Sequence, residues 1–154
     1  MSGYRFRLME DSEAAEISGW HYEPPYDFYD ATGDLDDLQE LLDAKRRKGA
    51  YFSAFDERGV LVGFFQFESD GTTVDVGLGM RPDLTGHGLG NGYLLAGLEF
   101  ARKRFSPEGF TLSVATFNER AILVYERAGF RRGSEYTHHT NGGEYLFLPM
   151  AREA

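Results

Sequence analysis

The 154-residue chain contains no cysteine. This absence excludes disulfide bonds, a thiolate nucleophile and cysteine-based zinc sites, and it agrees with a cytoplasmic location. Long apolar runs are also missing, so we expect no membrane-spanning segment and no membrane partner. The N-terminal residues lead directly into a strand-like segment, so we expect no signal peptide.

Positive charge is scarce in this sequence. Lysine and arginine number 16 against 25 aspartates and glutamates, which gives a formal net charge of −9. Nucleic acid backbones are bound mainly through lysine and arginine, so this balance argues against a nucleic acid partner. The charge favours a cationic small molecule, although acidic surfaces also serve solubility alone.

Repeats, low-complexity tracts and linker-like stretches are absent too, so we expect a single domain over residues 1–154. The hydrophobic periodicities predict an α/β (α+β mixed) fold of about seven strands and about four helices, in the order β-α-α-β-β-β-α-β-α-β-β. The predicted strands are 4–8, 51–55, 61–67, 72–80 and 110–115, followed by one strand before 141–143 and one after it. The predicted helices are 13–17, 34–48, 89–105 and 119–128.

Glycine is concentrated at one point, positions 86, 88, 90 and 92, between a predicted strand and a predicted helix. Glycine allows the positive φ angles and close backbone approach that a loop around a phosphate needs. The free N–H groups at the start of the helix would then point at the anion. A tight turn alone is the alternative, but it requires only one or two glycines. The pattern therefore predicts a pyrophosphate-binding loop.

Two common pyrophosphate-binding loops do not match this segment. A P-loop needs Gly-Lys-Ser/Thr at the helix start, and no lysine occurs between Met80 and Ala101. A dinucleotide fingerprint needs a third glycine where this sequence has Asn91 or Tyr93. Both classes are excluded.

Two segments carry a resemblance to a known family. Residues 80–90, Met-Arg-Pro-Asp-Leu-Thr-Gly-His-Gly-Leu-Gly, resemble the acetyl-CoA loop of GNAT acetyltransferases. Residues 118–130, Asn-Glu-Arg-Ala-Ile-Leu-Val-Tyr-Glu-Arg-Ala-Gly-Phe, resemble the second signature of the same superfamily. The likeness covers roughly residues 50–150 and implies a GNAT-like sheet that is mixed and mostly antiparallel.

The resemblance implies acetyl-CoA as co-substrate and no metal. It assigns backbone groups of Leu78, Gly79 and Met80 to the pantetheine arm and the thioester carbonyl, with a splayed strand, eased by a glycine bulge, freeing an N–H. It assigns the pyrophosphate to Gly86, His87, Gly88, Leu89, Gly90 and Asn91, and the pantetheine amide to Asn118.

The same resemblance implies that Tyr125 gives a proton to the departing thiolate, which a phenol of ordinary pKa can do at neutral pH. The alternative is packing, because Tyr125 also has helical core spacing. One departure from the family pattern is Thr85, which stands in place of an arginine or glutamine. His87 is one residue that could compensate for it.

The general base is not fixed by the sequence. Some family members carry a glutamate where this chain has Ser113, which cannot act as a base alone. Asp75 is the best of the remaining candidates, and an ordered water is the alternative. The other candidates are Glu23, His138 and His139.

The acceptor is expected to meet the aromatic segment 20–29. Its candidate substrate-binding residues are Trp20, Tyr22, Glu23 and Tyr26. Aromatic rings interleaved with carboxylates can cage an ammonium group. The same rings could instead pin a proline-containing loop onto the sheet or form a contact in a homodimer. Replacing Glu23 and Asp27 by alanine separates these interpretations, since only a cage predicts a higher acceptor KM.

The sequence therefore predicts an N-acetyltransferase. An acetyl group would pass from acetyl-CoA to a small amine or peptide amine by direct attack in a ternary complex, without a covalent enzyme intermediate. A non-catalytic acyl-CoA-binding module is the alternative, kept open by Thr85 and the missing glutamate.

Overall fold

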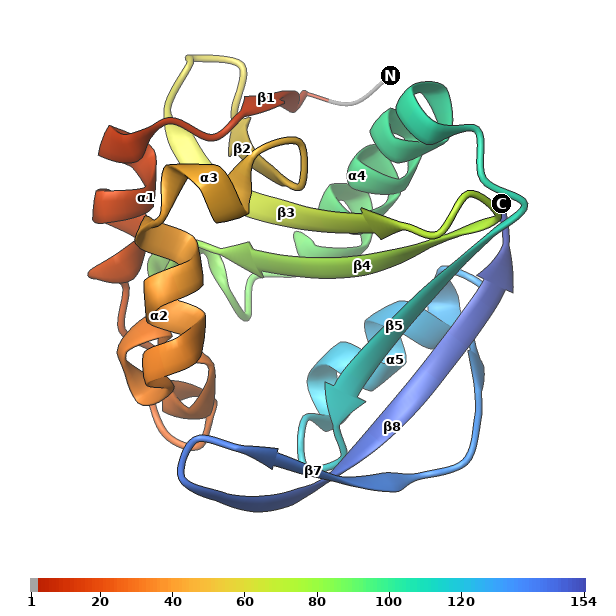
Figure 1. Cartoon of the computed structure of the whole chain (residues 1–154). Helices are drawn as coiled ribbons and strands as arrows, with labels where there is room; N and C mark the ends of the chain where they lie inside the picture. The colour runs from red at the N-terminus through yellow and green to blue at the C-terminus, as the bar shows by residue number, and fades with distance from the viewer. Residues whose placement is uncertain (1–2) are drawn as a thin grey trace.

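A computed structural model describes residues 3–154 (Figure 1). Its strands are β1 (Arg5–Leu8), β2 (Tyr51–Phe55), β3 (Leu61–Ser69), β4 (Thr73–Met80), β5 (Gly109–Ala115), β6 (Arg131–Arg132), β7 (Tyr136–Thr140) and β8 (Gly143–Glu153). Its α-helices are α1 (Asp11–Ser18), α2 (Leu35–Leu42), α3 (Ala44–Arg47), α4 (Gly90–Phe105) and α5 (Glu119–Arg127). Short 3-10 turns occupy η1 (Tyr26–Tyr29), η2 (Ala31–Gly33) and η3 (Pro82–Leu84). Within the described residues, no helix has the length and apolar character needed to cross a membrane.

The strands form one mixed sheet in the order β1-β2-β3-β4-β5-β8-β6, and β7 pairs with β8. Among the strand pairs of the described residues, only β4–β5 is parallel. The predicted fold class is confirmed. The sheet has one strand more than predicted because β6 is only two residues long, too short for any alternation to reveal.

Two predicted helix boundaries were wrong for local reasons. The helix expected over 34–48 is divided into α2 and α3 at Asp43, whose backbone is extended and whose side chain accepts from the Lys45 N–H. Asp43 is therefore an N-cap inside the predicted helix. The helix predicted over 13–17 begins earlier, at Asp11, because Glu10 caps it through a capping box with Glu13.

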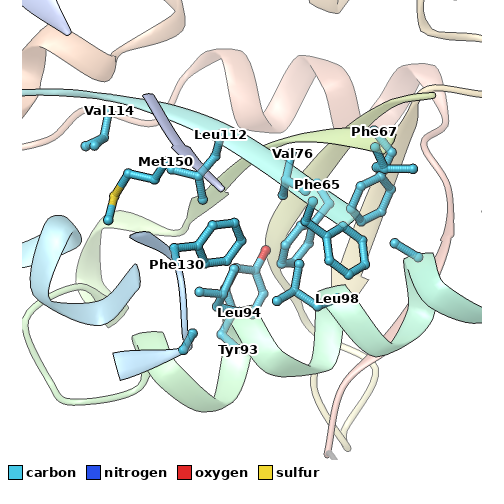
Figure 2. Close-up of a cluster of buried hydrophobic side chains, with 14 of the residues drawn as sticks. Phe65, Phe67, Val76, Tyr93, Leu94, Leu98, Leu112, Val114, Phe130 and Met150 are labelled. Atoms are coloured by element: carbon cyan, nitrogen blue, oxygen red, sulfur yellow. The ribbon is translucent and has the colours of Figure 1, made fainter. Parts of the chain in front are cut away.

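The main hydrophobic core lies between the sheet and α4, as Figure 2 shows. Leu94, Leu98 and Ala101 of α4 are fully buried, so the hydrophobic periodicity that predicted a helix over 89–105 corresponds to a buried face. At Gly97 the helix approaches the sheet so closely that an added Cβ would lie 2.1 Å from the ring of Phe65, which is itself fully buried. A side chain at position 97 would therefore force the helix or the ring to move.

Alanine substitution at two glycines of α4 should change the free energy of unfolding in opposite directions. We expect Gly97→Ala to lower the free energy of unfolding by about 1–3 kcal/mol through overpacking. Gly92→Ala is the matched control, because nothing lies within 4 Å of its added Cβ. It should raise stability by up to about 1 kcal/mol through helix propensity. Denaturant unfolding measures both, and equal effects of the two substitutions would contradict the close approach at Gly97.

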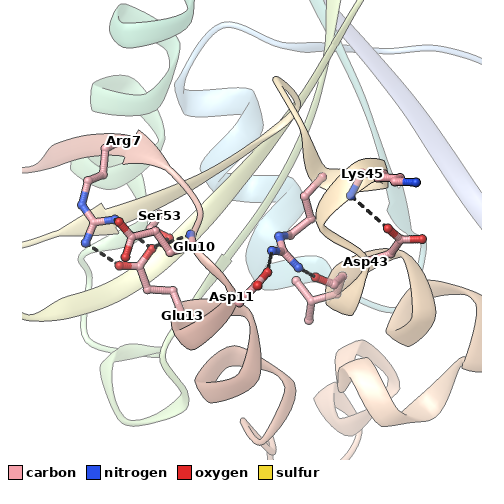
Figure 3. A network of polar contacts seen from close by, with 9 residues as sticks. Arg7, Glu10, Asp11, Glu13, Asp43, Lys45 and Ser53 are labelled. Carbon is pink, nitrogen blue, oxygen red and sulfur yellow. Dashed lines mark hydrogen bonds and ion pairs between the residues drawn. The ribbon is translucent and has the colours of Figure 1, made fainter.

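A polar network fastens α1 to the sheet and to α3 (Figure 3). The buried Glu13 carboxylate accepts from Ser53 Oγ at 2.7 Å, from the Glu10 N–H at 3.0 Å and from Arg7. Burial opposes its ionisation, but these hydrogen bonds outweigh burial and hold the pKa of Glu13 below its usual value. Arg47 is also buried, donates to Leu41 O and pairs with Asp11. The elements before β2 are thus held in place on one side of the sheet.

The sheet opens between β4 and β5. These strands pair only at their first three positions, from Thr73–Gly109 to Asp75–Thr111. Beyond Asp75 they diverge, and Figure 1 shows the two strands meeting near the C-terminus and separating toward α2. The expected splay is confirmed, but β4 contains no bulge, since its pairing with β3 runs unbroken to Met80. The divergence arises because β5 turns away to pair with β8.

Candidate functional site

The separation of β4 and β5 leaves peptide groups of β4 facing an open gap. Arg81 N–H donates to Val62 O on β3 at 2.8 Å. Peptide groups alternate sides along a strand, so the N–H groups of Leu78 and Met80 point away from β3 and into the gap. Strand β5 has no residue paired with them. Of the two, Leu78 lies nearer the point where the strands part.

Two cavities, of about 330 Å³ and about 200 Å³, fill this gap. Seven residues line both of them: Leu78, Gly79, Met80, Thr85, Asn118, Arg120 and Tyr125. Both predicted motifs therefore contribute to one continuous space. The structure brings the predicted residues of β4 together with Asn118 and Tyr125.

The glycine loop borders the smaller cavity through Gly86, Gly88 and Gly90. Gly86 and Gly88 have φ values of +75° and +76°, which other residues rarely adopt. The N-cap of α4, Leu89, makes no side-chain capping bond, so the first N–H groups of a 16-residue helix have no side-chain cap. A loop of this shape followed by an uncapped helix start fits a phosphate group.

Three predicted loop residues contribute no side chain to either cavity. His87, Leu89 and Asn91 are exposed, and only their backbone groups remain available to a phosphate. The hydroxyl of Thr85 donates to Pro82 O at 2.8 Å, so it is engaged within its own turn.

Arg120 places a positive charge beside the glycine loop, where His87 was the residue expected to compensate for Thr85. Its Nη1 lies 3.3 Å from the position of a Cβ built on Gly86, and the side chain borders both cavities. Its guanidinium also sits 4.1 Å from the centre of the Tyr26 ring. Arg120 thus connects the phosphate loop with the aromatic loop. The sequence reasoning missed it, although it lies inside the second motif, two residues after Asn118.

Asn118 is buried and has both ends of its amide engaged. Its Oδ1 accepts from the Ala121 N–H at 3.1 Å and caps α5, while its Nδ2 donates to Tyr29 Oη at 3.2 Å. Nδ2 carries a second N–H, which makes no hydrogen bond within residues 3–154 and remains available to a pantetheine amide. Tyr29 is a second site residue that the sequence reasoning missed.

Tyr125 lies on α5 and borders both cavities. Burial, with a smaller contribution from Tyr29, raises the pKa of its phenol above the usual value. The hydroxyl therefore stays protonated throughout the neutral range. Within residues 3–154, no group makes a hydrogen bond to Tyr125 Oη. The side chain can act as a proton donor to a group in the gap.

A third cavity, of about 280 Å³, adjoins the gap on the side of α2 and the aromatic loop. It shares Tyr22, Tyr29 and Phe64 with the larger gap cavity, so these three side chains form the boundary between the two spaces. Tyr22 Oη donates to Met80 O at 2.6 Å and ties the aromatic loop to β4. Trp20 also lines this third cavity and is largely buried.

The aromatic loop is pinned to the sheet as well. The Phe28 ring packs edge-to-face on Phe117, Tyr145 and Tyr29, with centroid distances of 5.4, 4.7 and 5.2 Å. Phe28 and Tyr29 also line the third cavity, so rings of this loop serve both packing and cavity lining. Glu23, in contrast, is exposed and lines none of these three cavities.

The candidate bases are dispersed, and the structure does not place Asp75 with Tyr125. Asp75 is exposed, accepts from Thr111 Oγ1 at 2.8 Å and borders neither cavity of the gap, because it lies at the last position where β4 still pairs with β5. His139 is exposed and faces Glu144. His138 alone among these candidates lines the third cavity. Within residues 3–154, no three His, Asp or Glu side chains are grouped to hold a metal ion.

The chain matches the family model described as "Acetyltransferase (GNAT) family" over residues 7–130. It belongs to the GNAT acetyltransferase family. The resemblance carried by the two motifs is thereby confirmed, together with the expected class of enzyme, an acyl-CoA-dependent acetyltransferase.

Solved GNAT structures share the fold over nearly the whole chain. A chimera of the Vibrio cholerae spermidine N-acetyltransferase SpeG and hSSAT is 19% identical with a TM-score of 0.79, covering 99% of this chain and 96% of that one. A GNAT acetyltransferase from Bacillus anthracis is 16% identical with a TM-score of 0.77, covering 99% and 95%. The Vibrio cholerae spermidine N-acetyltransferase in complex with CoA and spermine is 17% identical with a TM-score of 0.76, covering 98% and 95%.

One curated relative is more similar in sequence over a shorter stretch. The mycothiol acetyltransferase of Propionibacterium freudenreichii subsp. shermanii is 42% identical over 83 residues, which is 50% of this chain. The match spans only 26% of that protein, about a quarter of its length.

Proposed function

We propose that this GNAT protein is an N-acetyltransferase that moves an acetyl group from acetyl-CoA to a primary amine within a ternary complex. The observation that carries the proposal is that the third cavity adjoins the gap between β4 and β5. The gap between β4 and β5 joins the glycine loop to Tyr125, and the third cavity reaches the same gap past Tyr22, Tyr29 and Phe64. A phosphate-bearing acyl donor and an acceptor can therefore approach from opposite sides.

The residues of the gap fit coenzyme A in three respects. Gly86, Gly88 and the uncapped start of α4 fit the pyrophosphate, with Arg120 beside them. The N–H groups of Leu78 and Met80 offer donors to an extended arm and to a thioester oxygen. Acetyl-CoA would supply the activated acyl group when it is bound.

In the proposed reaction, an amine N–H bond and a thioester C–S bond break while an amide C–N bond and a thiol S–H bond form. Leu78 N–H stabilises the negative charge that develops on the carbonyl oxygen. Tyr125 gives its phenolic proton to the departing sulfur and recovers one from water, which receives the proton lost by the amine. Since Asp75 borders neither cavity of the gap, ordered water takes the role of base in this proposal.

The acceptor side supports an amine. The third cavity combines aromatic rings with the carboxylates of Asp30, Asp37 and Glu40, which suit an ammonium group. The shared fold with an enzyme solved with CoA and spermine agrees with this class.

Incubation with acetyl-CoA and a panel of amines, followed by mass spectrometry, tests the proposal. We expect an acceptor that gains the mass of one acetyl group, with an equal amount of free CoA released. A non-catalytic acyl-CoA-binding module would instead bind CoA and acetylate no amine in the panel. Thioester hydrolysis without an acetylated amine would also overturn the proposal.

A further inference from the structure

The third cavity is strongly acidic for its size. Among its lining residues are three carboxylates, Asp30, Asp37 and Glu40, and no lysine or arginine. His138 is the one lining residue that can carry a positive charge. The remaining walls are largely aromatic, with Trp20 the largest of the rings.

The three carboxylates differ in the hydrogen bonds and ion pairs that they make within the protein. Asp30 accepts from the Tyr22 N–H at 2.8 Å and contacts His21 Nδ1 at 2.9 Å. Glu40 accepts from Tyr51 Oη at 2.6 Å and has Arg46 at 4.0 Å. Both are therefore partly neutralised by the protein.

Asp37 has no comparable partner. Within residues 3–154, no hydrogen bond or ion pair is made to its carboxylate, while its backbone N–H donates to Asp34 Oδ1 at 3.1 Å. Burial raises the pKa of Asp37, and the nearby charges of Asp34, Glu40 and Asp36 raise it further, with His138 acting in the opposite direction. A positive charge placed beside Asp37 would relieve this repulsion.

We infer that the acceptor is an amine that carries a second positive charge, with Asp37 and Glu40 binding the distal cation. This inference rests on the proposed function. One amino group would pass Tyr22, Tyr29 and Phe64 to reach the gap, while the other end stays in the third cavity. The aromatic walls favour a cation over a neutral polar group, and the carboxylates favour it over an apolar tail. Asp37 is then a specificity-determining residue that takes no part in the acetyl transfer.

A pair of acceptors of equal length tests this inference. Diaminobutane and butylamine differ in the distal ammonium group, so the ratio of their kcat/KM values measures its contribution. We expect wild type to prefer diaminobutane, and Asp37→Asn to lower kcat/KM for diaminobutane by about fivefold, as for a partly exposed ion pair. The value for butylamine should stay unchanged, and Asp37→Glu should retain the preference.

Asp36→Asn is the matched control, because Asp36 lies on the same helix and does not line the cavity. Asp36→Asn should leave kcat/KM unchanged for both diaminobutane and butylamine. Equal kcat/KM values of wild type for the two amines, or an equal loss for both in Asp37→Asn, would overturn the inference while leaving acetyl transfer intact. No turnover of any amine would overturn the proposed function itself, and the inference with it.

Discussion

Tyr125→Phe should lower kcat by about 10²-fold, the lower range for loss of a positioned general acid. The substitution removes only the hydroxyl, which has no protein hydrogen bond to lose within the described chain. The KM for acetyl-CoA and the melting temperature should therefore change little. Steady-state kinetics with a saturating amine, together with a thermal melt, provide the measurement.

The pKa of Tyr125 gives the same experiment a second readout. Burial raises this pKa above the ordinary value for tyrosine, so the protonated form that donates is the one present at and above neutral pH. The kcat of wild type should not fall on the alkaline side until pH exceeds about 10. Tyr136→Phe is a control, because Tyr136 is exposed on β7 and lines none of the three cavities described. Full activity in Tyr125→Phe would assign this side chain to packing.

Leu78→Pro should lower kcat by about 10²–10³-fold, the range found when an oxyanion donor is removed. Proline removes the Leu78 N–H, which faces the gap and takes no part in the pairing of β4 with β3. The sheet should therefore tolerate the change, as edge strands do. Activity of a protein that remains folded by circular dichroism is the measurement.

Gly77→Pro tests the orientation on which that prediction depends. The N–H of Gly77 lies on the β3 side by the same alternation, so proline there removes a ladder hydrogen bond and should destabilise the fold. If Gly77→Pro were well folded and Leu78→Pro unfolded, the assignment of N–H groups to the gap would be reversed. An active Leu78→Pro enzyme would remove the proposed role of this donor.

The sequence predicted those parts of the molecule that depend on neighbouring residues. The glycine loop is one, because positive φ at Gly86 and Gly88 and the start of α4 are local properties. The apolar face of α4 is another, since its period is visible without knowing what it packs against. The splay of β4 from β5 followed from the resemblance, although its cause lies in the pairing of β5 with β8.

The remaining features depend on contacts between distant segments. Tyr29 and Asn118 are 89 positions apart, and no local sequence pattern near either residue predicts the hydrogen bond between them. Asp75 was the favoured base because it stands on the right strand, but it lies where β4 still pairs with β5, before the gap begins, and it accepts from Thr111. Asp37 looked like an ordinary residue in the first turn of a helix, and only the packing of α2 beside the aromatic loop makes it part of a cavity.

A crystal structure of the protein with CoA and an acetylated-amine product tests the central claim most directly. The arm of CoA should lie between β4 and β5, with its pyrophosphate at Gly86–Gly90 and its sulfur within hydrogen-bonding distance of Tyr125 Oη. The acetyl oxygen of the product should lie about 3 Å from Leu78 N. CoA bound outside the gap, or a product held away from Leu78 and Tyr125, would contradict the proposed site.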